Sequence, residues 1–352
     1  MNCPNKILRN PSKTHNNPRK ILRFYLRMTS YFVGCGALDA PPYKMQVATY
    51  FITNHHTKGK TMLDKIKNSR FLGELYLFIC VFFWAIAFIW TKDALTYGLS
   101  ANQLIFVRYT IAVLLMLPFV WKDLKKLTKK EIVLGGIGGL LLGAGMLLQT
   151  LGLGITTPSN SAFITTTYVV MVPFVAWIFQ RIRPTGKTYL CAGLALVGLF
   201  ILTKTPGQMM HFEVADLLTL GGAVVFAIQI VYWTYMSKQM GVKMVTFLPF
   251  VFIALFTLIM AFFTGDIVLE GENIPMALVN VALCAIFPTI ISGILQAAGQ
   301  RLVEPSKASI IMSLESVFTM FISVFLGYDA LNLNLIAGGA IIFTAIIISE
   351  LK

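Results

Sequence analysis

Charged residues are scarce in this chain. Aspartate, glutamate, lysine and arginine make up only 12% of its 352 residues, which is about half of their share in soluble domains. Hydrophobic residues make up 57%, and the mean hydropathy is +0.74. A soluble chain of this length cannot bury so much apolar surface. The composition therefore excludes a soluble globular protein and predicts an integral membrane protein.

Cysteine and histidine are also few. The five cysteines are scattered singly without any Cys-x-x-Cys pair, so we expect neither a disulfide framework nor a metal site. The four histidines all lie outside the long apolar runs: His15, His55, His56 and His211. The tripeptide that starts at Gly186 is not a phosphate loop, because the glycine required five positions earlier is Arg181. We predict no cofactor, no metal and no enzyme activity.

Long apolar runs are abundant. A helix that crosses the hydrocarbon core needs about 20 apolar residues, and ten suitable stretches follow residue 70. They span approximately 73–91, 102–121, 132–153, 159–179, 186–203, 215–236, 244–264, 275–297, 307–327 and 333–349. Pro173 and Pro288 lie inside two of them and predict kinks. The predicted fold class is an all-α integral membrane protein with ten transmembrane helices.

Lysine and arginine collect in every second connector, which is the pattern of cytoplasmic loops. These connectors contain Lys122, Lys125, Lys126, Lys129, Lys130, Arg181, Arg183, Lys187, Lys238, Lys243, Arg301 and Lys307. The alternate connectors are poor in cations, and one contains only the acids Asp266, Glu270 and Glu272. Both termini are therefore predicted to lie in the cytoplasm. Much of the net charge of +14 is this topology signal, so we do not expect nucleic-acid binding.

The apolar region is internally duplicated. The segment from Gln149 to Trp177 aligns without a gap with that from Gln296 to Val324, at an offset of 147 residues. A second register, offset by 142 residues, pairs Glu74 with Asp216, and we attribute both acids to favourable interaction with a helix N-terminus. We expect five-helix repeats at 70–204 and 213–350. Because five is odd, the second copy must enter the membrane from the opposite side, which makes the repeat inverted.

The first 61 residues match nothing that follows them. They are basic, with no acid before Asp39, and they lack a convincing apolar core for a cleavable signal peptide. A transit peptide is one interpretation of this composition. The interpretation that we prefer is a start at Met62, with residues 1–61 as a disordered or spurious extension.

Glu315 is an ionisable residue deep inside a predicted span. It lies about ten residues into the ninth stretch, close to the bilayer midplane, with no lysine or arginine within a helical turn. Ionisable residues at this depth are costly and frequently functional. Removal from water favours a protonated carboxyl group, which suits proton coupling or recognition of a cationic solute group. The alternative is a protonated side chain that only hydrogen-bonds a neighbouring helix.

Arg108 is the second ionisable residue that lies clearly inside a span, about six residues into the second stretch. A guanidinium group at this depth is a candidate for neutralising a substrate carboxylate. Alternatively, Arg108 pairs with Glu315 or with a helix carbonyl, or its side chain extends to the membrane surface.

Neutral polar and aromatic residues complete the candidate set. Tyr168 is the repeat partner of Glu315, and Gln149 is the repeat partner of Gln296. Amides and aromatic rings suit a cavity for an organic solute, although interhelical packing is the alternative. The predicted substrate-binding or coupling residues are Glu315, Arg108, Tyr168, Gln149, Gln229, Gln296, Trp84, Trp233 and Thr165.

The chain resembles the drug/metabolite transporter superfamily, EamA type, across about residues 70–350. The resemblance depends on the ten-span duplication and on three short motifs: Phe106-Val107-Arg108-Tyr109, Pro305-Ser306-Lys307-Ala308-Ser309 and Leu314-Glu315-Ser316-Val317-Phe318. The family usually has proline where this chain has Ser316. The resemblance implies export, or less often uptake, of amino acids or related metabolites from a central cavity between the halves.

We therefore predict a secondary transporter that exports a small organic metabolite by alternating access, with a cavity lined mainly by helices one, three, four, six, eight and nine. Its expected partners are the solute, protons and the lipid bilayer, with a homodimer left open. We expect it in the plasma membrane of a bacterium, crossing it several times. The alternatives are an ion-uncoupled facilitator, a nucleotide-sugar-type exchanger, a membrane scaffold or an enzyme.

Overall fold

The computed structural model describes residues 70–181, 183–203, 213–266, 269, 271–331 and 333–350. The predicted extension, residues 1–61, lies outside these ranges. Every regular element in the described ranges is helical. The first helix, Arg70–Thr96, is called helix 70–96 below. The others are α3 Ala101–Leu124, α4 Lys129–Ile155, α5 Pro158–Thr165, α6 Tyr168–Gln180, α7 Gly186–Thr203, α8 Val214–Gln239, α9 Val242–Thr264, α10 Ile274–Cys284, the π-helix η2 Ala285–Ile291, α11 Ser292–Leu302, α12 Pro305–Met312, α13 Leu314–Phe325 and α14 Leu333–Glu350.

Eight of the helical segments in the described ranges are long and apolar enough to cross a membrane. Three of these spans combine shorter helices: Pro158–Gln180 contains α5 and α6, Ile274–Leu302 contains α10, η2 and α11, and Pro305–Phe325 contains α12 and α13. The other two predicted stretches coincide with α7 and α14, of 18 residues each. Neither is among the eight, so the count of ten stays a prediction.

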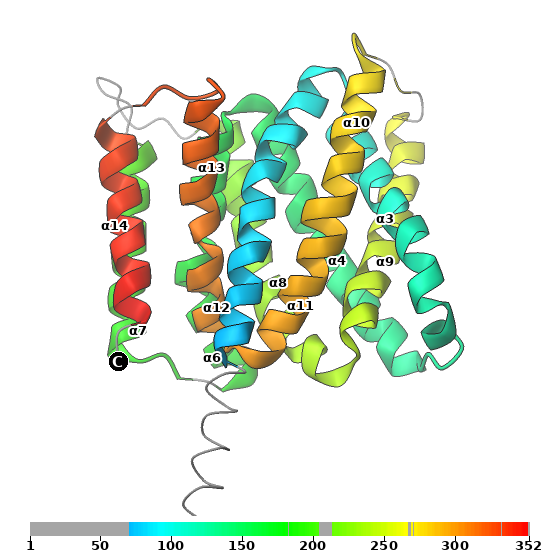
Figure 1. Cartoon of the computed structure of the whole chain (residues 1–352), viewed down its shortest axis with the longest axis horizontal. Coiled ribbons are helices and arrows are strands. Elements are labelled where there is room, and N and C mark those ends of the chain that lie inside the picture. The colour runs from blue at the N-terminus through cyan, green and yellow to red at the C-terminus, as the bar shows by residue number, and fades with distance from the viewer. Residues whose placement is uncertain are drawn as a thin grey trace, which may run out of the picture. The chain divides into compact units, whose positions relative to one another are not determined.

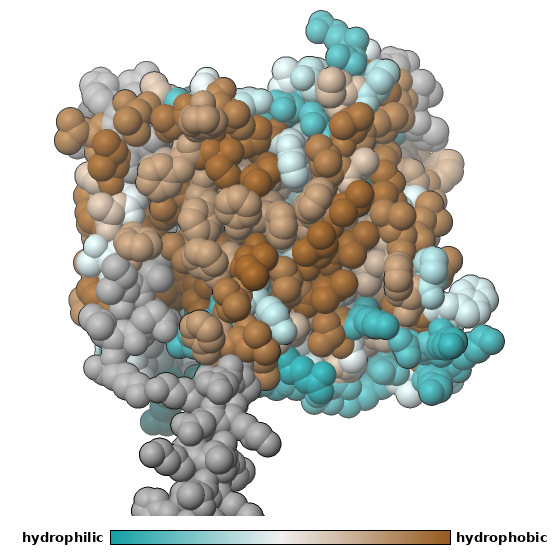
Figure 2. Space-filling view, viewed as in Figure 1, coloured by the Kyte–Doolittle hydropathy of each residue, from teal (hydrophilic) through white to brown (hydrophobic). Residues whose placement is uncertain are grey.

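The helices run side by side, and their lateral surface is apolar. In Figure 1 they stand nearly parallel, and in Figure 2 hydrophobic side chains cover the visible flank while polar ones gather at its two ends. Large hydrophobic residues are highly exposed, for example Phe263 at 84% and Phe325 at 88%. Exposed apolar surface of this extent fits contact with lipid.

Two ends of the molecule are distinguished by charge. The end where α3 stops and α4 begins carries Lys122, Lys125, Lys126, Lys129 and Lys130. We call it the basic face, and it lies at the bottom of Figures 1 and 2. Helix 70–96 and α12 also begin there, whereas α10 begins and α13 ends at the opposite face.

Local polar side chains determine where several helices start. Ser100 accepts a hydrogen bond from the backbone of Gln103, whose side chain accepts one from the backbone of Ser100. Thr128 and Glu131 form the same reciprocal cap at the start of α4. Such capping boxes satisfy amide groups that the first helical turn leaves without partners.

The spans that contain α5 and α12 are interrupted at equivalent positions. Each of these helices has eight residues and begins with proline, and they match at the offset of 147 found in the sequence. The interruption falls at Thr166 and Thr167 in one repeat and at Ser313 in the other. Each of these hydroxyl groups donates to a carbonyl three residues earlier, at 2.7–2.9 Å. The hydroxyl groups thereby satisfy backbone acceptors within the membrane.

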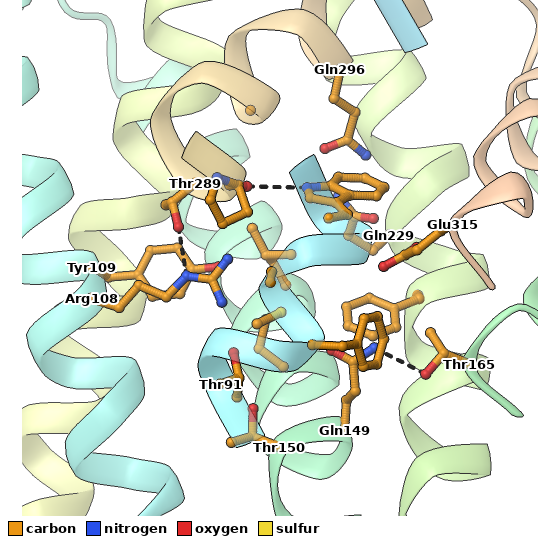
Figure 3. A pocket seen from close by; sticks show the side chains of 18 of the residues that line it. Thr91, Arg108, Tyr109, Gln149, Thr150, Thr165, Gln229, Thr289, Gln296 and Glu315 are labelled. Carbon is orange, nitrogen blue, oxygen red and sulfur yellow. Dashed lines mark hydrogen bonds between the residues drawn. The ribbon is translucent and has the colours of Figure 1, made fainter. Parts of the chain in front are cut away.

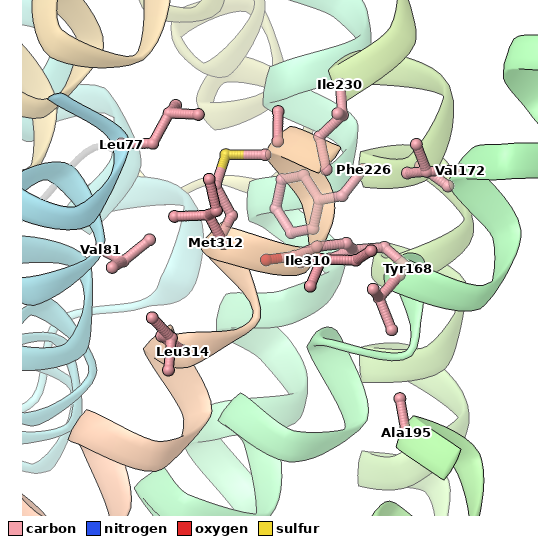
Figure 4. Packing of buried hydrophobic residues seen from close by; sticks show 14 of the residues in the cluster. Leu77, Val81, Tyr168, Val172, Ala195, Phe226, Ile230, Ile310, Met312 and Leu314 are labelled. Carbon is pink, nitrogen blue, oxygen red and sulfur yellow. The ribbon is translucent and has the colours of Figure 1, made fainter. Parts of the chain in front are cut away.

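A buried apolar cluster surrounds these interruptions. Leu77 and Val81 of helix 70–96 face Met312 and Leu314 at the break between α12 and α13, with Phe226 of α8 nearby (Figure 4). All of these side chains are at most 8% exposed. Close packing on all sides fixes the residues that follow each interruption.

The two repeats run in opposite directions. Helix 70–96 begins at the basic face, whereas α8 begins against the last turns of α4, at the opposite face. There a Cβ atom on Gly152 would lie 2.8 Å from the carbonyl oxygen of Ala215. In the other repeat a Cβ atom on Gly299 would lie 2.9 Å from the carbonyl oxygen of Gly73. These two close contacts match at offsets of 147 and 142, the registers found in the sequence.

Lys92 caps the C-terminal end of α4 at the opposite face. Its ammonium group donates to the carbonyl oxygens of Leu153, Gly154 and Thr156 at 3.0, 3.1 and 2.9 Å. The last carbonyl groups of a helix have no partner within the helix and carry partial negative charge. One lysine from helix 70–96 therefore both caps α4 and joins it to its neighbour.

Candidate functional site

A central cavity lies between the two repeats. All nine residues predicted from the sequence line it: Glu315, Arg108, Tyr168, Gln149, Gln229, Gln296, Trp84, Trp233 and Thr165. Their side chains converge from several helices (Figure 3). The lining comes from the six predicted helices and also from α3 and α9, the second and seventh spans, through Tyr109 and Phe250. That these residues bind or couple a solute stays a prediction.

Glu315 lies at the start of a half-helix. It is in the first turn of α13, directly after the interruption at Ser313, and it is 6% exposed. Its carboxylate points into the cavity (Figure 3), and no hydrogen bond or ion pair joins it to another described residue. A carboxyl group placed in this way can bind and release a proton, or it can bind a cationic group directly.

Arg108 is buried on another wall of the cavity, at 4% exposure. Its Nε donates to Oγ1 of Thr289 at 2.6 Å, and its guanidinium carbon lies 5.7 Å from the ring centre of Tyr109. Within the described part of the chain it forms no ion pair with Glu315 and no hydrogen bond to a helix carbonyl. The two alternative pairings proposed from the sequence are therefore not observed, and neither is extension to the surface. The terminal nitrogens of the guanidinium group face the cavity (Figure 3).

A π-helical segment holds Arg108 and Trp84 in place. Pro288 lies within η2, where the kink is predicted, and its carbonyl accepts from Nε1 of Trp84 at 3.1 Å. The hydroxyl group of Thr289 donates to the carbonyl of Cys284 at 2.7 Å, so its lone pairs face the Nε of Arg108. Proline has no amide hydrogen, and π-turns of this kind often occur at functional sites.

Several polar atoms in the lining have no protein partner. Gln149 donates to Oγ1 of Thr165 at 2.9 Å. By contrast, Thr150 Oγ1, Tyr168 Oη, Gln229 Nε2 and Trp233 Nε1 are buried without a hydrogen bond in the described structure. Buried polar groups are normally satisfied, and all four residues belong to the cavity lining.

The combined chemistry is that of a site for a small organic molecule. Apolar and aromatic side chains form most of the wall, and a few polar groups together with the ionisable side chains of Arg108 and Glu315 converge on it. Among the described residues no group of three or more histidine, cysteine or acidic side chains could hold a metal ion. The arrangement can present a guanidinium group and a carboxyl group to one bound molecule.

Sequence reasoning missed Thr289, Tyr109 and Thr150, all of which line the cavity. Threonine and tyrosine are common in membrane helices, so composition does not distinguish them. Two weak sequence signals pointed to two of these residues: Tyr109 directly follows Arg108, and Thr289 directly follows Pro288, where a kink is predicted.

Comparisons with known proteins agree with this architecture. The sequence model of the EamA-like transporter family matches the chain twice, at residues 71–204 and 214–351. An uncharacterized transporter from Archaeoglobus fulgidus is 30% identical over 283 residues, which cover 80% of this chain and 87% of that protein. A solved crystal structure with 14% sequence identity superposes with a TM-score of 0.64 and covers 79% of this chain and 96% of its own. At that identity the likeness shows the fold alone.

Proposed function

Because the chain belongs to the EamA-like transporter family, and so to the drug/metabolite transporter superfamily, we propose that it exports an amino acid or a related small metabolite by alternating access. The observation that carries this proposal is the pair of buried ionisable side chains in the cavity, Arg108 and Glu315. Each is nearly inaccessible and neither has an ionic partner among the described residues. A buried guanidinium group without an ionic partner is costly, and removal from water favours the protonated form of Glu315. A ligand with an anionic group would relieve the cost at Arg108, and its cationic group would replace the proton on Glu315.

The proposed ligand contacts follow from the chemistry of the two groups. A carboxylate of the solute would accept from the terminal nitrogens of Arg108, which face the cavity. An ammonium group of the solute, or a proton, would bind the carboxylate of Glu315. The rings of Trp84 and Tyr168 would pack against the solute's remaining atoms.

Glu315 is the proposed coupling residue. A proton and a cationic solute group would compete for the same buried carboxylate, so that loading one releases the other and the two fluxes run in opposite directions. The half-helix start beneath Glu315 resembles the broken helices that form ion and substrate sites in other transporters.

The proposed location is the plasma membrane, with the basic face in the cytoplasm. Lysine and arginine at the ends of spans favour the cytoplasmic side, and the basic face carries five lysines from the last turn of α3 to the first turn of α4. In this orientation export moves solute from the basic face to the opposite face.

The test compares metabolites outside cells that produce the wild type with those outside cells that produce Glu315→Gln, at equal membrane abundance. Glu304→Gln is the matched control, because Glu304 is an exposed residue at the start of α12. We expect one solute class to be enriched by the wild type and by Glu304→Gln but not by Glu315→Gln. Equal enrichment by all three proteins, with counterflow that ignores pH, would instead favour an ion-uncoupled facilitator.

A further inference from the structure

Two polar contacts join helix starts that belong to different repeats. Lys307, near the start of α12, forms an ion pair with Glu74, near the start of helix 70–96, with 2.6 Å between Nζ and Oε1. Asn160, near the start of α5, donates from Nδ2 to Oδ1 of Asp216 in the first turn of α8, at 3.0 Å. Each contact therefore ties one repeat to the other.

The two contacts occupy equivalent positions in the duplicated sequence. Lys307 lies 147 residues after Asn160, and Asp216 lies 142 residues after Glu74. These are the two registers that relate the repeats. The same structural contact therefore occurs twice, once as an ion pair and once as an amide that donates to a carboxylate.

The contacts lie at opposite ends of the cavity. Lys307 and Glu74 are at the basic face, where α12 and helix 70–96 begin. Asn160 and Asp216 are at the opposite face, next to the close approach of Gly152 to α8. The equivalent close approach of Gly299 to helix 70–96 lies next to the ion pair. Each polar contact thus lies beside a close helix crossing at a glycine.

We propose that these contacts are two latches that control which face of the cavity opens. We call Lys307–Glu74 the basic-face latch and Asn160–Asp216 the opposite-face latch. Opening toward a face separates the two helix starts of its latch and leaves the other latch closed. This inference rests on the proposed alternation of access, and it names the residues that set the balance between the two orientations.

The two latches differ in chemistry, so substitutions can change the balance between opening at the basic face and opening at the opposite face. In the basic-face latch the side chains are 38% and 26% exposed, so solvent screens the pair and its strength is modest. An amide in place of an ammonium group has no net charge and holds Asp216 less strongly. Replacing Asn160 by lysine, or Lys307 by asparagine, copies the equivalent residue of the other repeat and should therefore shift the balance between the two openings.

The experiment uses two variants that copy each repeat from the other: Asn160→Lys and Lys307→Asn. Both are made in full-length protein with the native cysteines replaced and with Met146→Cys, in the cavity lining, as the reporter. A membrane-impermeant maleimide is applied to intact cells and to inverted vesicles. The readout is the ratio of the two labelling rates.

We expect the two variants to move this ratio in the same direction, toward labelling through the basic face, each by about two- to fivefold, which is the range for a partly exposed ion pair. Asn160→Lys strengthens the opposite-face latch, and Lys307→Asn weakens the basic-face latch, so both variants favour opening at the basic face. The two separate labelling rates distinguish the variants: Asn160→Lys slows labelling through the opposite face, and Lys307→Asn speeds labelling through the basic face.

The ratio alone therefore cannot be the criterion, and the individual rates decide. The inference requires Asn160→Lys to lower the rate through the opposite face, and Lys307→Asn to raise the rate through the basic face, so the two variants shift the ratio in the same sense through different rates. Lys125→Asn removes the same charge from the basic face without touching a latch and should change neither rate. Unchanged rates in both latch variants would overturn the inference.

A charge exchange guards against misfolding. Glu74→Lys and Lys307→Glu should each raise the rate through the basic face, and the double variant should restore it to within about twofold of the wild type. Failure of the double variant to restore the rate would also overturn the latch assignment. If the parent Met146→Cys protein is labelled from one face only under every condition, the proposed alternation itself fails, which distinguishes that failure from failure of the latches.

Discussion

Arg108 and Thr289 are joined by a 2.6 Å hydrogen bond across 181 residues of sequence. The bond links α3 to the π-helical segment η2. Because the hydroxyl hydrogen of Thr289 is used on the carbonyl of Cys284, the oxygen can act toward Arg108 only as an acceptor. The contact therefore fixes the plane of the guanidinium group and directs its terminal nitrogens into the cavity.

Replacing Thr289 by valine should weaken recognition of a carboxylate. Valine has the same shape but offers no acceptor, so the guanidinium group loses its orientation. We expect the apparent affinity for an amino acid to fall about tenfold, while the affinity for the corresponding amide changes little. Thr289→Ser should retain the wild-type values. Competition by the acid and by the amide in proteoliposomes measures both, and equal losses for the two would argue against orientation.

The pH dependence of transport should depend on Glu315. If a proton and the solute compete for this carboxylate, flux through the wild type varies with the imposed pH gradient, and flux through Glu315→Gln does not. Glu304→Gln should keep the wild-type profile. Uptake of labelled solute into vesicles at several internal and external pH values is the measurement, and a preserved pH profile in Glu315→Gln would remove this residue from coupling.

Gly152→Ala should destabilise the protein. The added methyl group would lie 2.2 Å from Oγ1 of Thr219 and 2.8 Å from the carbonyl of Ala215, so α4 and α8 must separate. We expect a cost of about 1–3 kcal/mol. Gly154→Ala is the control, because its nearest neighbour would be Leu95 Cδ1 at 3.9 Å, an ordinary contact. Thermal denaturation in detergent compares the two variants, and equal melting temperatures would contradict the tight crossing.

Tyr328 should stabilise the protein in a pH-dependent way. Its hydroxyl group donates to Asp93, and burial together with this hydrogen bond raises the pKa of Tyr328 above its usual value. A raised pKa means that the folded state holds the proton more tightly than the unfolded state. The stabilisation is therefore complete below about pH 10 and is lost as the pH rises toward the folded value. Tyr328→Phe should melt a few degrees lower than the wild type at neutral pH, and this difference should shrink above about pH 10.

Much of the candidate site could be predicted because charged and polar residues are easily recognised within the apolar sequence of a membrane helix. Glu315 and Arg108 are conspicuous in an apolar context, and the duplication led from Glu315 to Tyr168 and from Gln296 to Gln149. All of them line the same cavity. The registers of 147 and 142 also match contacts in the structure, such as those of Gly152 and Gly299.

The interruptions and the π-turn could not be predicted. Thr166 and Ser313 replace backbone partners with hydroxyl groups, which leaves the apolar pattern of a span unchanged. The predicted stretch 159–179 is not one continuous helix, because the break separates Tyr168 from Thr165. The role of Thr289 depends on a partner 181 residues away, and such a contact exists only once the helices have packed.

The hydrogen bonds of Lys92 change how its charge should be counted. Lys92 lies at the face predicted to be outside, where cations are scarce, and three carbonyl oxygens at the end of α4 share its ammonium group. Their partial negative charges offset much of its field at short range. To an ion or a solute that approaches this face, the lysine is one pole of a local dipole rather than a free positive charge, and the charge asymmetry of the protein is larger than a count of its lysines suggests.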